Sequence, residues 1–168
     1  AELDRHIVEL AQKEPYKTPV RYLECFRGIK TLTAITLIVE VMDFKRFERA
    51  PSFMGFTGMT SSERSSGPKV RRFSITKVGN SHVRRVLVEA AWHYRHKSIN
   101  ATALRKRREG CPSAVLQIAR KADSRLSKRY FRLVSRGKPS QVAVVAVARE
   151  LAGFVWAMAK HFPENTQN

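Results

Sequence analysis

The 168-residue sequence is poor in cysteine and in acidic residues. Its two cysteines, Cys25 and Cys111, have no CxxC spacing, which argues against a zinc site or a disulfide framework and fits a reducing compartment. It also has no signal-peptide pattern, no internal repeat and no initiating Met. We therefore expect a cytoplasmic protein whose sequence here is cut from a longer one.

A long uninterrupted apolar run is also missing. The most apolar segment, residues 140–161, contains the charged pair Arg149-Glu150 near its centre, which argues against a membrane span and against a membrane partner. A helix that is apolar on nearly all sides is expected to be the central core helix, or a core helix that also packs on a partner. The hydrophobic fraction of 43% and the nine Phe residues exclude a wholly disordered chain.

Negative charge is scarce, because 14 Asp and Glu residues stand against 32 Lys and Arg residues, for a net charge of +18. Residues 64–108 contain 13 Lys or Arg and a single acid, Glu89, so this segment carries +12. A concentrated basic segment indicates a polyanionic partner, with nucleic acid first and acidic membrane surfaces second. The alternative is a solvated basic face that has no partner.

Helical signals dominate, and we predict an all-α, compact helical domain with a helix-hairpin-helix-like turn, an exposed Ser-rich loop and a basic arm. Pro15 and Pro19 separate residues 1–14, the end of a linker or coiled-coil helix, from a helical domain over 15–162, and residues 163–168 are a frayed tail. Helices are expected at 31–42, 82–97, 114–135 and 140–161. A Ser/Gly loop is expected over 57–67, a basic hairpin or arm over 68–77, and a polar link over 98–110.

Gly28-Ile29, between two expected helices, fits the turn of a helix-hairpin-helix, in which backbone N–H groups meet a DNA phosphate. A C-cap glycine is the alternative explanation. Trp92 and Tyr94 have two explanations as well, base stacking or core packing. The histidines at 82, 93 and 96 have no carboxylate or thiol at ligand spacing, so we predict no metal site.

The Ser-rich loop lies directly before the basic arm. A serine hydroxyl becomes a useful nucleophile when cations stabilise the charge that grows on a phosphate and a metal or base takes its proton. Arg64, Lys69, Arg71 and Arg72 are positioned in the sequence to supply that field. The alternative is that the serines form an ordinary loop.

Several motifs follow one another along the chain: FTGMT at 56–60, SSG at 65–67, ITKVGN at 75–80 and RRVLVEAAW at 84–92. In this order they resemble the C-terminal transposase domain of the serine/RuvC-like insertion-sequence transposases, which are relatives of the Piv invertase and act as bridge-RNA-guided recombinases. The resemblance implies a bacterial, nucleoid-associated protein. The close match covers about residues 23–92.

The resemblance implies a composite enzyme that cuts and rejoins DNA through a phosphoserine link. In that family a separate RuvC-like domain holds Mg²⁺ with a DEDD tetrad, and the domain seen here supplies the nucleophilic serine before the glycine of an SG pair. By position this serine is Ser66, with Ser65 as the register alternative. DNA, a guide (bridge) RNA and a homo-oligomer are the implied partners. The residues expected to bind nucleic acid are Arg64, Lys69, Arg71, Arg72, Lys77, Arg84, Arg85 and Lys30.

The sequence departs from the family pattern at three places. The Pro-Gly-Ile-Gly turn reads Arg27-Gly28-Ile29-Lys30, a proline of the serine region is replaced by Ser61, and the acidic tetrad is absent. We therefore expect the chain alone to bind nucleic acid without cutting it, and Mg²⁺ to belong to the RuvC-like domain. The alternative functions are a non-catalytic basic DNA- or RNA-binding module and a structural interaction protein.

Overall fold

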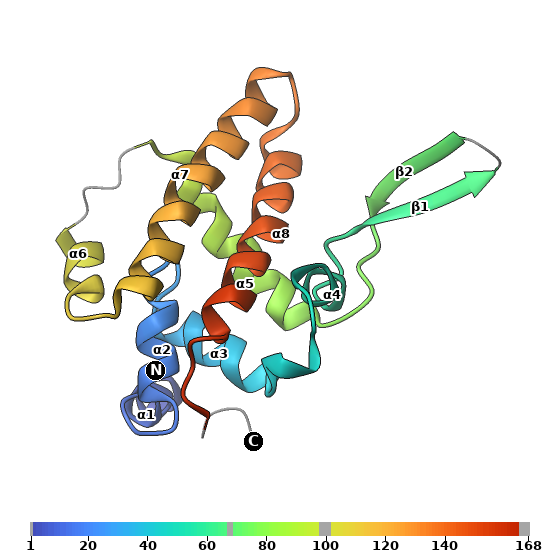
Figure 1. Cartoon of the computed structure of the whole chain (residues 1–168). Coiled ribbons are helices and arrows are strands. Elements are labelled where there is room, and N and C mark those ends of the chain that lie inside the picture. Colours follow the sequence, from blue (N-terminus) through green and yellow to red (C-terminus); the bar gives the residue numbers. More distant parts are fainter. Residues whose placement is uncertain (1, 67–68, 98–101, 165–168) are drawn as a thin grey trace.

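Helices form the body of the molecule, and a two-stranded hairpin projects from it (Figure 1). The computed structural model describes residues 2–66, 69–97 and 102–164, and it describes residues 62–66 and 69–74 by their backbone alone. The helices are α1 (Glu2–Ala11), α2 (Lys17–Leu23), α3 (Thr31–Val41), α4 (Ala50–Phe56), α5 (Ser81–Ala91), α6 (Thr102–Arg108), α7 (Ser113–Ser135) and α8 (Ser140–Ala159), with 3₁₀ turns η1 (Phe44–Arg46) and η2 (Trp92–Arg95). The strands are β1 (Ser61–Ser66) and β2 (Lys69–Ile75). The predicted all-α class is confirmed.

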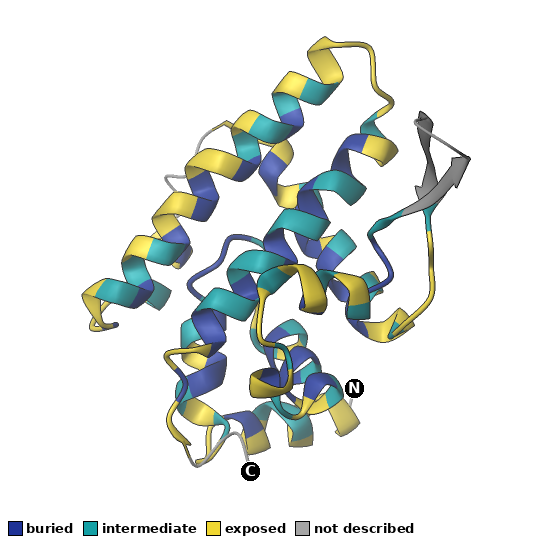
Figure 2. Cartoon of the chain, turned by 45° about the vertical axis from the view of Figure 1, so that its right-hand side comes forward, coloured by how far each residue is buried: buried dark blue, intermediate teal, exposed yellow. Residues whose placement is uncertain are grey.

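The helix α8 is the centre of the core, as its composition predicts. It packs against α2, α4, α5 and α7, and nine of its side chains are buried. By length and composition α8 would be able to cross a membrane, but half of its most apolar stretch is buried inside the protein. In Figure 2 the buried residues of α8 alternate with residues of intermediate exposure, and the buried ones face the core, which explains much of the apolar character of the helix.

The apolar stripes of the other helices also face this core. The predicted helix over 82–97 is observed as α5 and η2, and Val83, Val86, Leu87, Ala90 and Ala91 form a buried stripe along α5. Asn80 caps the helix, and its side-chain oxygen accepts a hydrogen bond from the N–H of Val83 at 2.9 Å. The apolar segment predicted over 31–42 is the helix α3, which is buried on one side, whereas Leu32 and Val39 are exposed.

The predicted Ser-rich loop is partly wrong. Its second half is the strand β1, which pairs with β2 in an antiparallel hairpin, and the pairing is irregular between Ser61 and Glu63. Serine and glycine have low strand propensity, but the backbone hydrogen bonds of a hairpin form irrespective of side-chain type. Of the two alternatives predicted for residues 68–77, a hairpin or an extended arm, the structure shows an extended strand over Lys69–Ile75, and the hairpin is completed by β1.

The polar link predicted over residues 98–110 is also wrong in part, because Thr102–Arg108 form the helix α6. This helix has one buried apolar side chain, Leu104, so no periodic apolar stripe announces it in the sequence. Pro19, expected to break a helix, lies instead in the first turn of α2, where its missing N–H removes no intrahelical hydrogen bond.

Candidate nucleic-acid interface

The hairpin places the predicted nucleophile across from predicted cation positions. In the register of β1 and β2, Ser66 lies opposite Lys69, Ser65 opposite Val70, and Arg64 opposite Arg71. Directly opposed residues of an antiparallel pair have Cα atoms about 4.5–5.5 Å apart. Gly67 of the SG pair lies outside the described residues, as do the side chains of residues 62–74. The backbone alone therefore brings the serine and cation positions together at the tip end of the hairpin.

The root of the hairpin is fixed by the motifs that flank it. The N–H of Lys77 donates to the carbonyl of Gly58 at 3.0 Å, and the N–H of Asn80 donates to the carbonyl of Phe56 at 2.9 Å. Gly79 has a φ of +120°, and a Cβ at this position would lie 2.1 Å from the Phe56 carbonyl oxygen. Only glycine fits such a close approach at such a φ. The FTGMT and ITKVGN motifs therefore hold the two strands where they leave the helical body.

Arg84 belongs to this root. Its half-buried guanidinium donates from Nη1 to the carbonyl of Thr57 at 3.2 Å, so it ties α5 to the segment before β1. Arg85, the next residue, is exposed and lies 3.9 Å from Glu89 one helical turn away. Of the two α5 residues predicted to bind phosphate, Arg84 is engaged within the protein and Arg85 faces solvent.

The remaining predicted cations do not form a single cluster in the described part of the chain. Lys77 is exposed beside the hairpin root. Lys30 is exposed where α3 begins, and the adjoining Gly28 meets α5 at Ala90, far along that helix from the root. The side chains of Arg64, Lys69, Arg71 and Arg72 lie outside the described residues.

The Gly28 turn is packed into the body. Gly28 has a φ of +85°, and a Cβ there would lie 2.4 Å from the carbonyl oxygen of Ala90. The helix α2 ends at Leu23, so Gly28 is not its C-cap residue. The close approach of α5 is therefore what requires glycine at this position.

A second group of arginines, which sequence reasoning missed, faces inward. We call Arg27, Arg107, Arg108 and Asp123 the inner arginine cluster. Arg108 Nη2 lies 2.7 Å from one carboxylate oxygen of Asp123, and Arg27 Nε lies 3.8 Å from the other. Burial raises the pKa of Asp123 more than the hydrogen bond from Arg108 lowers it.

These arginines also bind backbone carbonyls that no helix satisfies. Arg27 Nη1 donates to the carbonyl of His96 at 2.8 Å, and Arg107 Nη1 donates to the carbonyl of Ile29 at 3.0 Å. The cluster thereby joins the Arg27–Lys30 turn to η2, α6 and α7. One signal in the sequence points to it: Asp123 is an acid on the buried face of α7, between Ala122 and Leu126.

The two cysteines belong to the same region, although 85 residues separate them in the sequence. Both are buried free thiols, and the Sγ atoms lie 3.6 Å apart. Burial, together with the neighbouring Cys111, raises the pKa of the Cys25 thiol to about 12. The thiol is therefore protonated at neutral pH.

The structure separates the two aromatic residues that were considered for base stacking. Tyr94 is fully buried, so base stacking is excluded for it. Trp92 is half-buried and packs on the core, with the Arg95 guanidinium 5.7 Å from the ring centroid.

Three acidic residues of the described chain, Glu40, Asp43 and Asp123, lie in separate places and bind different partners. Glu40 accepts a hydrogen bond from the side chain of Asn80 at 2.9 Å, Asp43 accepts one from the N–H of Lys45, and Asp123 lies in the inner arginine cluster. Among the residues that the structure describes, no three His, Cys, Asp or Glu side chains come together as metal ligands. These residues do not fit the acidic tetrad that the resemblance implies for Mg²⁺.

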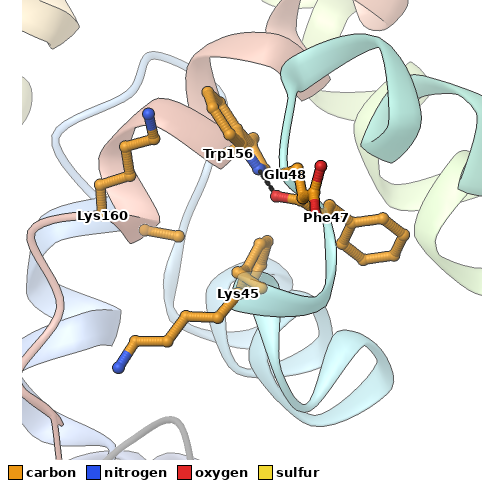
Figure 3. Close-up of a pocket in the computed structure, with 7 residues that line it drawn as sticks. Lys45, Phe47, Glu48, Trp156 and Lys160 are labelled. Atoms are coloured by element: carbon orange, nitrogen blue, oxygen red, sulfur yellow. Dashed lines mark hydrogen bonds between the residues drawn. The ribbon is translucent and has the colours of Figure 1, made fainter.

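A cavity of about 280 Å³ lies between the end of α8 and the segment before α4 (Figure 3). The Trp156 indole N–H donates to the carbonyl of Phe47 at 2.9 Å, and Lys160 Nζ lies 4.0 Å from the indole ring centroid. Lys45 extends away from the indole (Figure 3). The polar edge and one face of the Trp156 indole are therefore already engaged within the protein. The hydrogen bond to Phe47 joins α8 to the segment before α4.

Known proteins are similar to this chain over a region that includes the hairpin and the helices around it. The model of the transposase IS116/IS110/IS902 family matches residues 20–106, from within α2 to within α6. A Sinorhizobium fredii protein named as a transposase, y4qE, is 45% identical over 144 residues, which are 86% of this chain and 37% of that protein. The transposase for insertion sequence element IS1533 of Leptospira borgpetersenii is 36% identical over 138 residues, 81% of this chain and 40% of that protein. The chain thus spans about two fifths of the length of these relatives.

Proposed function

This chain belongs to the IS116/IS110/IS902 transposase family, and on that premise we propose that it is the catalytic-serine and nucleic-acid-binding domain of a DNA transposase. Joined to a RuvC-like domain, it cuts and rejoins DNA through a phosphoserine link. Guide RNA and further copies of the protein complete the assembly. The isolated chain binds nucleic acid without cutting it.

The observation that carries the proposal is the hairpin. It extends away from the helices (Figure 1), and its register sets Ser66 opposite Lys69 and Arg64 opposite Arg71. A nucleophile on a projecting element reaches a phosphate within a duplex without requiring the helical body to enter a groove. Cations beside it stabilise the charge that develops on the phosphate oxygens.

In the proposed reaction, the Ser66 hydroxyl oxygen attacks the phosphorus of one strand. A P–O bond to serine forms, the P–O bond of the strand breaks, and the leaving oxygen takes a proton. The strand remains attached to the protein, so its phosphodiester energy is kept for rejoining. Mg²⁺ held by the RuvC-like domain supplies Lewis-acid chemistry when bound.

The test is to trap the covalent link. The full-length parent is incubated with labelled donor DNA, its guide RNA and Mg²⁺, denatured, and mapped by mass spectrometry for a protein–DNA adduct. The expected adduct is on Ser66 and is lost in Ser66→Ala. Ser62→Ala, in the same strand, is the matched control and keeps the adduct. An adduct on Ser65 moves the nucleophile by one residue.

The second candidate function is a non-catalytic basic nucleic-acid-binding module, which the +12 of residues 64–108 supports equally well. Such a module binds with an affinity that falls steeply with salt, and it tolerates loss of Ser66. Undiminished recombination by the full-length Ser66→Ala protein would establish this second function and end the serine proposal.

A further inference from the structure

The helix α7 carries a row of cations on its solvent side. Lys121, Arg125, Lys128, Arg132 and Arg136 follow one another at spacings of four, three, four and four residues, which places them on one face of the helix and its C-terminal extension. All five side chains are exposed. We call these five residues the α7 cation row.

Most of this row is not neutralised. Arg125 lies 3.0 Å from Glu150 of α8, and this carboxylate also lies 3.5 Å from Arg129. Lys121, Lys128 and Arg132 form no ion pair with any carboxylate of the described residues. Like charges three or four residues apart oppose helix formation, so the row is unfavourable for the helix on its own. An anionic partner removes that repulsion.

The row is long enough to run along several phosphates of a DNA backbone. At 1.5 Å per residue, the fifteen steps from Lys121 to Arg136 extend over roughly 22 Å, with one cation at about every 5.4 Å turn. DNA presents one phosphate per strand for about every 3.4 Å of its axis, so a straight row of this length runs along several phosphates.

The row lacks the groups that a single strand needs. Proteins that bind single strands stack bases on exposed aromatic rings. The aromatic residues of α7 are Tyr130, which is buried, and Phe131, which is half-buried with Lys97 Nζ 5.0 Å from its ring centroid. A rigid cationic helix face without exposed aromatic rings favours the backbone of a duplex.

The α7 cation row is separate from the hairpin. In Figure 1, α8 lies between α7 and the hairpin, and in Figure 2 exposed residues follow the side of α7 that faces away from α8. The helix α7 packs on α8 with its opposite, buried side. A segment of nucleic acid on the row therefore does not compete with one at the hairpin.

We infer that the α7 cation row is a second nucleic-acid surface, which binds the phosphate backbone of duplex DNA without reading its sequence. The inference rests on the proposed function because it takes DNA as the substrate. It adds a contact that holds a duplex on the side of the domain away from the nucleophile. Backbone contacts of this kind set position and carry no base specificity.

The test measures the binding of this chain to a 20-base-pair DNA duplex over a range of salt concentrations. The variant K121Q/K128Q/R132Q removes three charges from the row, and the charge-matched control R5Q/K13Q/K17Q removes three exposed charges from the α1–α2 end. Each lost phosphate contact lowers the slope of log K against log salt by about 0.9, so the row variant is expected to lose about 2.7. The control keeps the wild-type slope. K121R/K128R/R132K, which retains the charges, binds as the wild type does.

Three outcomes would overturn the inference. They are an equal loss in the row variant and the control, an unchanged slope in the row variant, and a loss that appears with an RNA duplex or with single-stranded DNA but not with duplex DNA. Melting curves from circular dichroism confirm that each variant is folded. The two proposals can fail separately. The serine proposal fails if no adduct forms on Ser66 or Ser65, whereas this inference fails on the salt slope, which Ser66→Ala leaves unchanged because the row stays intact.

Discussion

Arginines and lysines lie on both sides of the helix α7. The inner arginine cluster packs against its buried side around Asp123, whereas the α7 cation row is on its exposed side. The Arg27 and Arg108 side chains are 10% and 13% exposed and bind Asp123, whereas the Arg125 side chain in the row is 62% exposed. The inner arginines satisfy carbonyls and a carboxylate that would otherwise be buried without partners. Lys121, Lys128 and Arg132 of the row form no ion pair among the described residues. The number of Lys and Arg residues in the sequence therefore overstates the number of cations that are exposed and available to bind a phosphate.

The difference changes the interpretation of the basic segment 64–108. Arg84 binds the carbonyl of Thr57, Arg107 binds that of Ile29, and Arg108 binds Asp123. These three cations hold the fold together and have little freedom to meet a phosphate. The row on α7 lies outside that segment and has the exposure that phosphate binding requires.

Loss of Asp123 is expected to have the largest effect on stability. Asp123→Ala leaves the positive charges of Arg27 and Arg108 buried without a counter-ion, and breaking a buried pair in this way costs about 3–5 kcal/mol. Urea denaturation measures the change in the free energy of unfolding. Arg125→Ala, which breaks an exposed contact to Glu150, is the control and is expected to cost at most about 1 kcal/mol. Equal losses in the two variants would refute the distinction between inner and outer arginines.

The second prediction concerns the Arg27–Lys30 turn, in which Gly28 follows the buried Arg27. Gly28 and Gly137 share a φ of +85°, but a Cβ on Gly28 would lie 2.4 Å from the Ala90 carbonyl oxygen, whereas a Cβ on Gly137 would have nothing within 4 Å. Gly137→Ala therefore costs only the positive φ, roughly 1–2 kcal/mol. Gly28→Ala adds an overpacking cost of about 1–3 kcal/mol. If the two losses measured by urea denaturation were the same, the close approach of α5 would not constrain the turn.

The sequence predicts the parts of this molecule that depend on local patterns. Apolar composition indicates α3 and α8, start and stop signals indicate α7, and apolar periodicity indicates α5, whose last turns continue as η2. None of these signals identifies α6, where only Leu104 is buried, or β1, whose residues are serine, glutamate and arginine. The position of Ser66 opposite Lys69 is known only once β1 and β2 are paired. The inner arginine cluster joins residues up to 96 positions apart, and no local sequence pattern encodes such a contact.

The buried thiols beside the inner cluster give a kinetic test. Because burial raises the pKa of Cys25 from 9.0 to about 12, little thiolate is present in the folded protein at pH 8.5. Iodoacetamide is expected to label Cys25 much more slowly in the native chain than in urea. A raised pKa in the folded state contributes stability below pH 9 that is lost as the pH rises toward 12. The Cys25→Ala variant should lack this part of the pH dependence, and rapid native labelling would show that the site opens to solvent.

The smallest expected effect concerns the α7 cation row. K121Q/K128Q/R132Q removes exposed charges that repel one another along the helix, and each such repulsion costs about 0.2–0.5 kcal/mol. The free energy of unfolding should therefore stay within about 0.5 kcal/mol of the wild type or rise slightly, while R5Q/K13Q/K17Q serves as the charge-matched control. A loss above about 1 kcal/mol in the row variant alone would mean that the row packs within the fold, like the inner arginines. An unchanged stability together with a shallower salt slope would mean that the fold gains nothing from these cations, so their place on α7 is explained by the DNA they bind.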